Sequence, residues 1–227
     1  LPKGLSASDS ARASLIMRCM VQIQTKMPLS SYLLCLNIAI LWIVVECKFS
    51  TVSREQIDKN PYWEYVKDRY ILPTGSEGDY YFVHTNGSVM IVPLLENGEL
   101  LMTEQYRYLD KRISIEFPGG GVKAKGEYLA SALDELAEET GASAQKITYI
   151  GEFNPFNGVT DEICEVYIAE GIEISEAMPE ASEDIKVLKL TCEQIVDKIK
   201  TGEIYDGMTI TAFTLFYLYY YSVDRKC

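Results

Sequence analysis

One segment, residues 116–142, constrains this chain more than any other, because three consecutive glycines run directly into an acidic helical pattern. The glycines at 119–121 carry no side chains, so their backbone can approach a phosphate or a metal ion closely. Beyond them, apolar residues at 3–4 spacing predict a helix from about Tyr128 to Thr140, stopped by Gly141. The residues predicted to form its buried face are Leu129, Ala132, Leu133 and Leu136.

The opposite face of this predicted helix carries four carboxylates: Asp134, Glu135, Glu138 and Glu139. At spacings of three and four residues their side chains converge on one patch, where like charges repel. No basic residue on the helix offsets this repulsion. The patch is therefore either a solvated acidic face or a site for a hard divalent cation such as Mg²⁺. The neighbouring glycines favour the cation.

The rest of the pattern predicts a small strand-rich region followed by an α/β domain. Asn97-Gly98, between two apolar runs, predicts a hairpin that joins residues 88–95 to 100–106. The last helix, 209–223, has no charge and is too short to span a bilayer comfortably, so we predict that it is buried. The other predicted elements are strands at 62–71, 80–85, 114–117, 146–153, 163–169 and 185–190, and a helix at 192–201.

The first 45 residues differ in character from the rest. An uncharged run at residues 27–45 (MPLSSYLLCLNIAILWIVV) follows a basic flank. This arrangement is typical of a signal peptide or membrane anchor. Two other interpretations remain open: a hydrophobic helix packed on the body, or a non-native start that includes residues 1–26. Membrane contact is expected only through residues 27–45.

Composition excludes several classes of function. The chain of 227 residues has 21 basic and 33 acidic side chains, a formal charge of −12, so no nucleic-acid partner is expected. A single histidine, His84, excludes a His-rich zinc site. The six cysteines form no CxxC pair and are interpreted as scattered thiols of a reducing compartment. We therefore expect a cytoplasmic protein, with membrane anchoring through residues 27–45 as the alternative.

The segment 116–142 resembles the box of the Nudix hydrolases, G-x5-E-x7-R-E-U-x-E-E-x-G-U, where U is aliphatic. Residues 134–142 match its helical half, with Asp134 in the position of the arginine. Gly121 and Glu127 satisfy the first half, but six residues rather than seven then precede Asp134. In the family the arginine helps to hold the glutamates by ion pairing. An aspartate there puts the affinity for metal in doubt more than the fold.

The resemblance extends over residues 47–223 to the ADP-ribose pyrophosphatase branch of the family. It implies an α+β fold, in which a Nudix α/β/α sandwich with a mixed sheet follows a small antiparallel N-terminal sheet. The domains would be a 1–45 extension, a 46–86 β subdomain and an 87–227 Nudix domain. The matching segments are 104–107 (EQYR), 116–120 (EFPGG), 154–162 (NPFNGVTDE), 183–187 (EDIKV) and 202–207 (GEIYDG).

By this resemblance, the chain hydrolyses ADP-ribose to AMP and ribose 5-phosphate. Glu135, Glu138, Glu139 and the Gly119 carbonyl would hold Mg²⁺, with Mn²⁺ as an alternative. Arg107 would clamp phosphate unless it forms only a surface ion pair. Glu116 and Glu162 would support the metals or the wall of the site.

The catalytic base implied by the resemblance is Glu183. Glu180 and the box glutamates, Glu138 and Glu139 among them, remain alternatives. Trp63, Tyr62 and Tyr65 are candidates to stack on adenine, across a homodimer, although aromatic residues of this kind are more often core residues than ligand contacts.

Two other functions stay open. One is a Nudix hydrolase for another nucleotide sugar, and the other is a catalytically weak Nudix domain that acts as a nucleotide sensor. The departure at Asp134 favours the sensor, whereas the presence of the main carboxylates disfavours it.

Overall fold

The computed structural model describes residues 49–124, 126–175 and 185–223. The predicted segment 27–45 and the loop with Glu180 and Glu183 lie outside these residues. The N-terminal elements are β1 (Ser50–Lys59), β2 (Glu64–Ile71), β3 (Glu77–His84), β4 (Ser88–Pro93), β5 (Leu100–Arg107), β6 (Arg112–Glu116) and β7 (Gly119–Gly121). They are followed by α3 (Tyr128–Thr140), β8 (Ala142–Phe153), β9 (Cys164–Ile174), β10 (Lys186–Leu190), α4 (Cys192–Thr201) and α5 (Gly207–Val223).

Strands β1, β2 and β3 form a small sheet in that order, as predicted for the N-terminal sheet. A side-chain contact links the first two strands: Arg54 Nε on β1 donates to Asp68 Oδ1 on β2 at 2.7 Å. The last strand is tied to the segment before β9, because the Val83 amide donates to the Val159 carbonyl. The single histidine, His84, pairs there with Asp161 at 2.7 Å.

The main sheet has the order β7-β4-β9-β8 and is mixed. Strand β4 runs antiparallel to β7 and parallel to β9, with Ser88 opposite Cys164 in the second pair. Strands β8 and β9 are antiparallel. A second sheet, β10-β5-β6, is antiparallel throughout.

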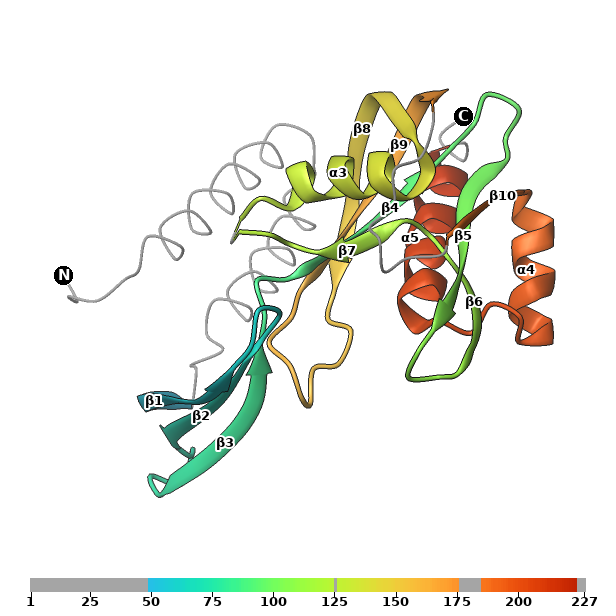
Figure 1. The fold of residues 1–227 in the computed structure, drawn as a ribbon. Coiled ribbons are helices and arrows are strands. Elements are labelled where there is room, and N and C mark those ends of the chain that lie inside the picture. The colour runs from blue at the N-terminus through green and yellow to red at the C-terminus, as the bar shows by residue number, and fades with distance from the viewer. Residues whose placement is uncertain (1–48, 125, 176–184, 224–227) are drawn as a thin grey trace, which may run out of the picture. The chain divides into compact units, whose positions relative to one another are not determined.

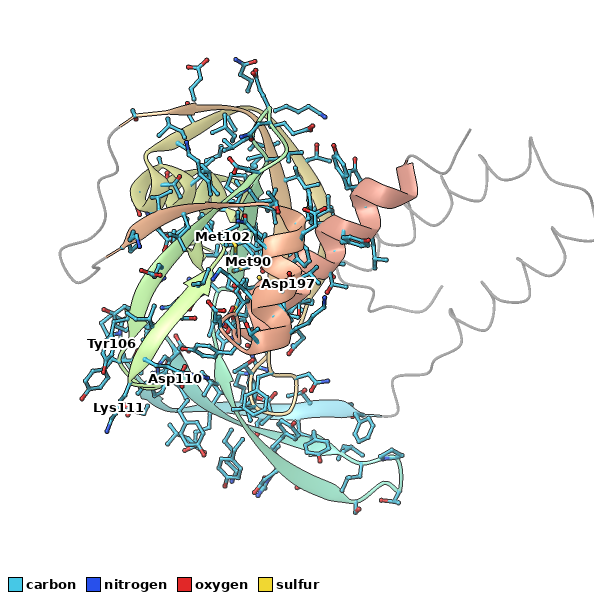
Figure 2. All side chains as sticks on the ribbon, turned by 90° about the vertical axis from the view of Figure 1, so that its right-hand side faces the viewer. Met90, Met102, Tyr106, Asp110, Lys111 and Asp197 are labelled. Atoms are coloured by element: carbon cyan, nitrogen blue, oxygen red, sulfur yellow. The ribbon has the colours of Figure 1, made fainter. Side chains whose placement is uncertain are left out.

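Strand β4 lies between two hydrophobic cores, because successive side chains of a strand point to opposite faces. Val89 and Ile91 pack with α3, whereas Met90 and Val92 pack with α5. Figure 1 shows α3 and α5 on opposite sides of this sheet. Met90 and Met102, from β4 and β5, lie in the interior in Figure 2. The predicted α/β/α sandwich is confirmed.

The predicted hairpin between residues 88–95 and 100–106 is wrong. Its turn forms, since the Gly98 amide donates to the Leu95 carbonyl and Leu94 forms a bridge with Leu100. Beyond that bridge β4 and β5 enter different sheets. Both strands are buried along most of their length. Strand β4 pairs with β7 and β9, whereas β5 pairs with β6 and β10.

Helix α5 only partly meets the prediction of a buried helix. Ala212, Phe213 and Phe216 are buried in the core, whereas Tyr217 to Tyr220 are all exposed. Among the described residues, no helix combines the length and apolar character needed to cross a membrane.

Replacing Phe216 with alanine should lower the free energy of unfolding by about 3–5 kcal/mol, because it opens a cavity beside β4. The side chain is only 1% exposed. Leu218→Ala, on the same helix but 60% exposed, should change stability by less than about 0.5 kcal/mol. Urea denaturation of both variants measures the difference. Equal losses would contradict the packing of α5 described above.

Candidate active site

A cleft of about 720 Å³ opens beside the glycine strand β7. Its walls are formed by the start of β4, the β5–β6 hairpin, α3 and the segment before α5. Seven residues predicted for the site line it: Arg107, Glu116, Gly119, Glu135, Glu138, Glu139 and Glu162. Residues separated by more than 50 positions in the chain are therefore brought together in one cleft.

The glycine segment forms a short strand that pairs with residues 88–90 of β4. Its lack of side chains lets α3 lie directly against it. A methyl group added at Gly120 would overlap the Glu135 carboxylate, and one at Gly119 would overlap the Val89 carbonyl. The Gly119 amide donates a hydrogen bond to Glu139 Oε2 at 3.3 Å. Backbone and carboxylates thus form one surface.

Contact with the glycine strand also changes which face of α3 is buried. Leu129 and Leu133, predicted to be buried, are 47% and 39% exposed. Glu139, predicted to lie on the exposed acidic face, is only 3% exposed. Ala132 and Leu136 are buried as predicted. The helix is rotated so that the carboxylate side meets the glycines, which leave room for it.

Lys123 offsets part of the charge on the carboxylate face. Its Nζ lies 3.1 Å from Asp134 Oδ2 and 3.4 Å from Glu138 Oε1. The hydrogen bond to Asp134, followed by that to Glu138, raises the pKa of the Lys123 ammonium. The helix itself has no basic side chain to offset its charge, and Lys123, in the segment before the helix, supplies one.

Arg107 and Glu116 form a bidentate pair across the β5–β6 hairpin. Arg107 Nε donates to Glu116 Oε1 at 2.8 Å, and Nη2 donates to the other carboxylate oxygen. Glu116 is buried, and its hydrogen bonds raise the pKa of Arg107, with Asp206 and Glu139 adding to the effect. The guanidinium is thus fixed, with N–H groups to spare for a ligand in the cleft. It is not a simple surface pair.

In the cleft wall the buried hydroxyl groups of Ser114 and Tyr205, like that of Ser88, have no hydrogen-bond partner among the described residues. Leaving a buried hydroxyl unpaired costs about 1–3 kcal/mol, so these groups suit a polar ligand or water. Sequence reasoning missed all three. The available signal for Ser114 was its place two residues before Glu116, which puts the two side chains on one face of β6.

At the turn between β5 and β6, Asp110 also lines the cleft, whereas Tyr106 and Lys111 point outward in Figure 2. Trp63, predicted to bind substrate, is exposed and is not among the cleft residues, although its neighbour Tyr62 is. The role of Glu183 stays a prediction.

The oxygen-rich donor set of Glu135, Glu138, Glu139 and the Gly119 backbone suits a hard divalent cation. The side-chain-free strand beside Glu135 leaves space for close approach to it. In the described part of the chain, no three His, Cys, Asp or Glu side chains are grouped so that they could hold one metal ion. Glu138 is instead paired with Lys123.

Comparison with known proteins identifies the family. Residues 84–208, just over half of the chain, match the family described as NUDIX domain. The chain belongs to the Nudix family. The prediction of a Nudix pyrophosphohydrolase related to ADP-ribose pyrophosphatases is thereby confirmed. Nudix hydrolases generally use divalent metal cations and act on small-molecule nucleotide substrates.

The relatives differ in their named activities. An ADP-ribose pyrophosphatase of Bacillus subtilis (strain 168) is 31% identical over 74% of this chain and 91% of its own length. A methanol dehydrogenase activator of Bacillus methanolicus is 29% identical over 71% and 89%. A solved ADP compounds hydrolase superposes with a TM-score of 0.67 and 17% identity, covering 78% of this chain and 96% of that one. This last likeness confirms the fold.

Adding a methyl group at Gly120 should displace the Glu135 carboxylate and lower the rate of nucleotide hydrolysis by at least about tenfold. Stability should change little, because the overlapping atoms belong to the end of a flexible side chain. Gly121→Ala is the matched control, since nothing lies within 4 Å of its added methyl. Steady-state kinetics and thermal unfolding of both variants provide the test. Equal activity would contradict the contact.

Proposed function

We propose that this Nudix protein is a Mg²⁺-dependent hydrolase of a nucleoside diphosphate linked to a sugar, with ADP-ribose as substrate and AMP and ribose 5-phosphate as products. The observation that carries the proposal is the cleft itself. It combines the box glutamates, a fixed guanidinium and unpaired hydroxyl groups in one space. The likeness to the ADP-ribose pyrophosphatase of Bacillus subtilis supports the choice of substrate.

Glu135, Glu138 and Glu139, with the Gly119 carbonyl, are the groups that would hold Mg²⁺. When bound, the cation neutralises phosphate charge and makes a coordinated water more acidic. Glu139 is already held by the Gly119 amide, and Glu135 lies against Gly120. Both carboxylates line the cleft beside a strand that has no side chains.

Arg107 is proposed to bind a phosphate oxygen of the diphosphate. Glu116 acts through it as a positioning residue, because the bidentate pair fixes the plane of the guanidinium. Ser114 and Tyr205 are proposed to donate or accept hydrogen bonds with the sugar portion, which is rich in hydroxyl groups.

We assign the base that takes a proton from the attacking water to Glu183, on the resemblance to the ADP-ribose pyrophosphatase branch. We also expect a homodimer in which aromatic residues near Tyr62 contact the adenine. A cytoplasmic location is proposed because Cys164 and Cys192 are free thiols.

Hydrolysis of a different nucleotide conjugate is the second candidate, favoured by a relative from Streptomyces rubellomurinus (strain ATCC 31215), 23% identical over 70% of this chain, that is named as a hydrolase of a CMP-linked phosphonate. Incubation with ADP-ribose, nucleotide sugars and NAD derivatives, with product chromatography, distinguishes the two. We expect ADP-ribose to show the highest kcat/KM and excess EDTA to abolish turnover. Binding of ADP-ribose without turnover at any Mg²⁺ or Mn²⁺ concentration would identify a sensor instead.

Glu183→Gln should lower kcat by about 10²–10⁴ with little change in KM, because the amide keeps the shape of the side chain but cannot accept the proton. The loss should shrink at high pH, where hydroxide replaces the missing base. Glu180→Gln is the matched control and should have a mild effect. A severe defect in the control alone would move the base to Glu180. Mild effects in both would move it to a box glutamate.

A further inference from the structure

The carboxylate face of α3 poses an electrostatic problem that the helix itself does not solve. Asp134 and Glu138 are four residues apart, so their negative charges repel. The described structure brings Lys123 between them, 3.1 Å from Asp134 and 3.4 Å from Glu138. A divalent cation that uses Glu138 must therefore compete with an ammonium group already beside it.

The backbone of Lys123 is held from several directions. Its amide donates to Ser131 Oγ on α3 at 3.4 Å, and its carbonyl accepts from Asn86 Nδ2 at 3.4 Å. The preceding residue, Val122, is buried and donates to the Gly87 carbonyl at 2.9 Å. The backbone that carries the Lys123 side chain is thus held in place beside the cleft, although the side chain itself is more than half exposed.

We propose that Lys123 is the resident counter-ion of the carboxylate face, and that a divalent cation displaces its ammonium from Glu138 while Asp134 retains it. Asp134 then has a definite role, which is to hold the displaced ammonium away from the incoming cation. The inference rests on the proposed function, because it assumes that Glu138 is a cation ligand. Lys123 and Asp134 are positioning residues and do not touch the reacting atoms.

The alternative is an ordinary exposed ion pair, which contributes little to stability and nothing to cation binding. The two interpretations predict different effects of removing each partner. Without Lys123, Glu138 loses its competitor and binds a cation more tightly, while the metal-free protein loses the relief of repulsion. Without Asp134, the ammonium remains with Glu138 and opposes the cation more strongly.

The test measures binding of Mn²⁺ alone, with free Mn²⁺ followed by its EPR signal and no substrate present. Lys123→Met should lower Kd by roughly threefold to tenfold, the scale expected for removing one partly screened charge near the ion. It should also lower the Tm of the protein in EDTA, so that the increase in Tm on adding Mn²⁺ becomes larger. Lys123→Arg should behave like the wild type.

A double-mutant cycle separates the proposed role of Asp134 from a general effect of its charge. Asp134→Asn should raise Kd in the wild-type background but have much less effect when combined with Lys123→Met. Equal effects in both backgrounds would mean that Asp134 acts directly on the cation and would overturn its assigned role. Lys200→Met, which removes a similar exposed pair with Asp197, is the control and should leave Kd unchanged.

Failure of this inference is distinguishable from failure of the proposed function. If the wild-type protein binds no Mn²⁺, the proposed metal-dependent function is overturned, and the inference with it. If the wild-type protein binds Mn²⁺ but Lys123→Met binds it equally or more weakly, Lys123 is not a competing counter-ion, and the function stands.

Discussion

The close approach of α3 to the glycine strand β7 is the contact on which the rest of the cleft depends. Any side chain at Gly120 would occupy the space that the Glu135 carboxylate now fills. Because the strand has no side chains, a helix rich in carboxylates can pack with part of its acidic side facing the strand. Glu139 is buried there and accepts a hydrogen bond from the Gly119 amide. Burying a carboxylate is costly unless it is hydrogen-bonded, and the exposed backbone supplies that bond.

Strand β4 holds this contact in place. It pairs with β7 on one edge and β9 on the other, while its two faces belong to two separate cores. A shift of β4 by one residue would exchange the residues facing α3 with those facing α5. The positions of the glycines relative to α3 are therefore set by core packing well away from the cleft, and the geometry of the cleft follows from it.

The sequence was informative wherever structure depends on local pattern. The limits of α3 and α4, and the termination of α3 at Gly141, follow from spacing and helix-ending residues close in the chain. The motif segments also contain the seven predicted site residues that line the cleft. What could not be predicted depends on partners distant in sequence. Asn97-Gly98 predicted a turn correctly, but local signals do not reveal that β4 prefers β9 to β5.

The same reasoning explains the errors on α3. Leu129 and Leu133 have the spacing of a buried face, yet both are exposed. The helix packs on a strand without side chains, so the side of the helix that carries Glu139 is buried instead. Lys123 lies outside the helix, so the charge pattern of the helix alone showed uncompensated repulsion. Ser114 lies outside the matching segments, and Tyr205, inside segment 202–207, was given no role there, because a hydroxyl becomes notable only when its surroundings leave it unpaired.

The parallel pairing of β4 with β9 has a consequence for how the protein is made. Ser88 meets Cys164 only after a long intervening stretch has been synthesised, and closing such a loop has an entropic cost that slows folding. Until then, the apolar strand β4 presents an open edge to other chains in the cell. Nascent chains are therefore expected to be most prone to aggregation between the emergence of β4 and that of β9. During that interval, protection by chaperones should matter more to the yield of this protein than its final stability.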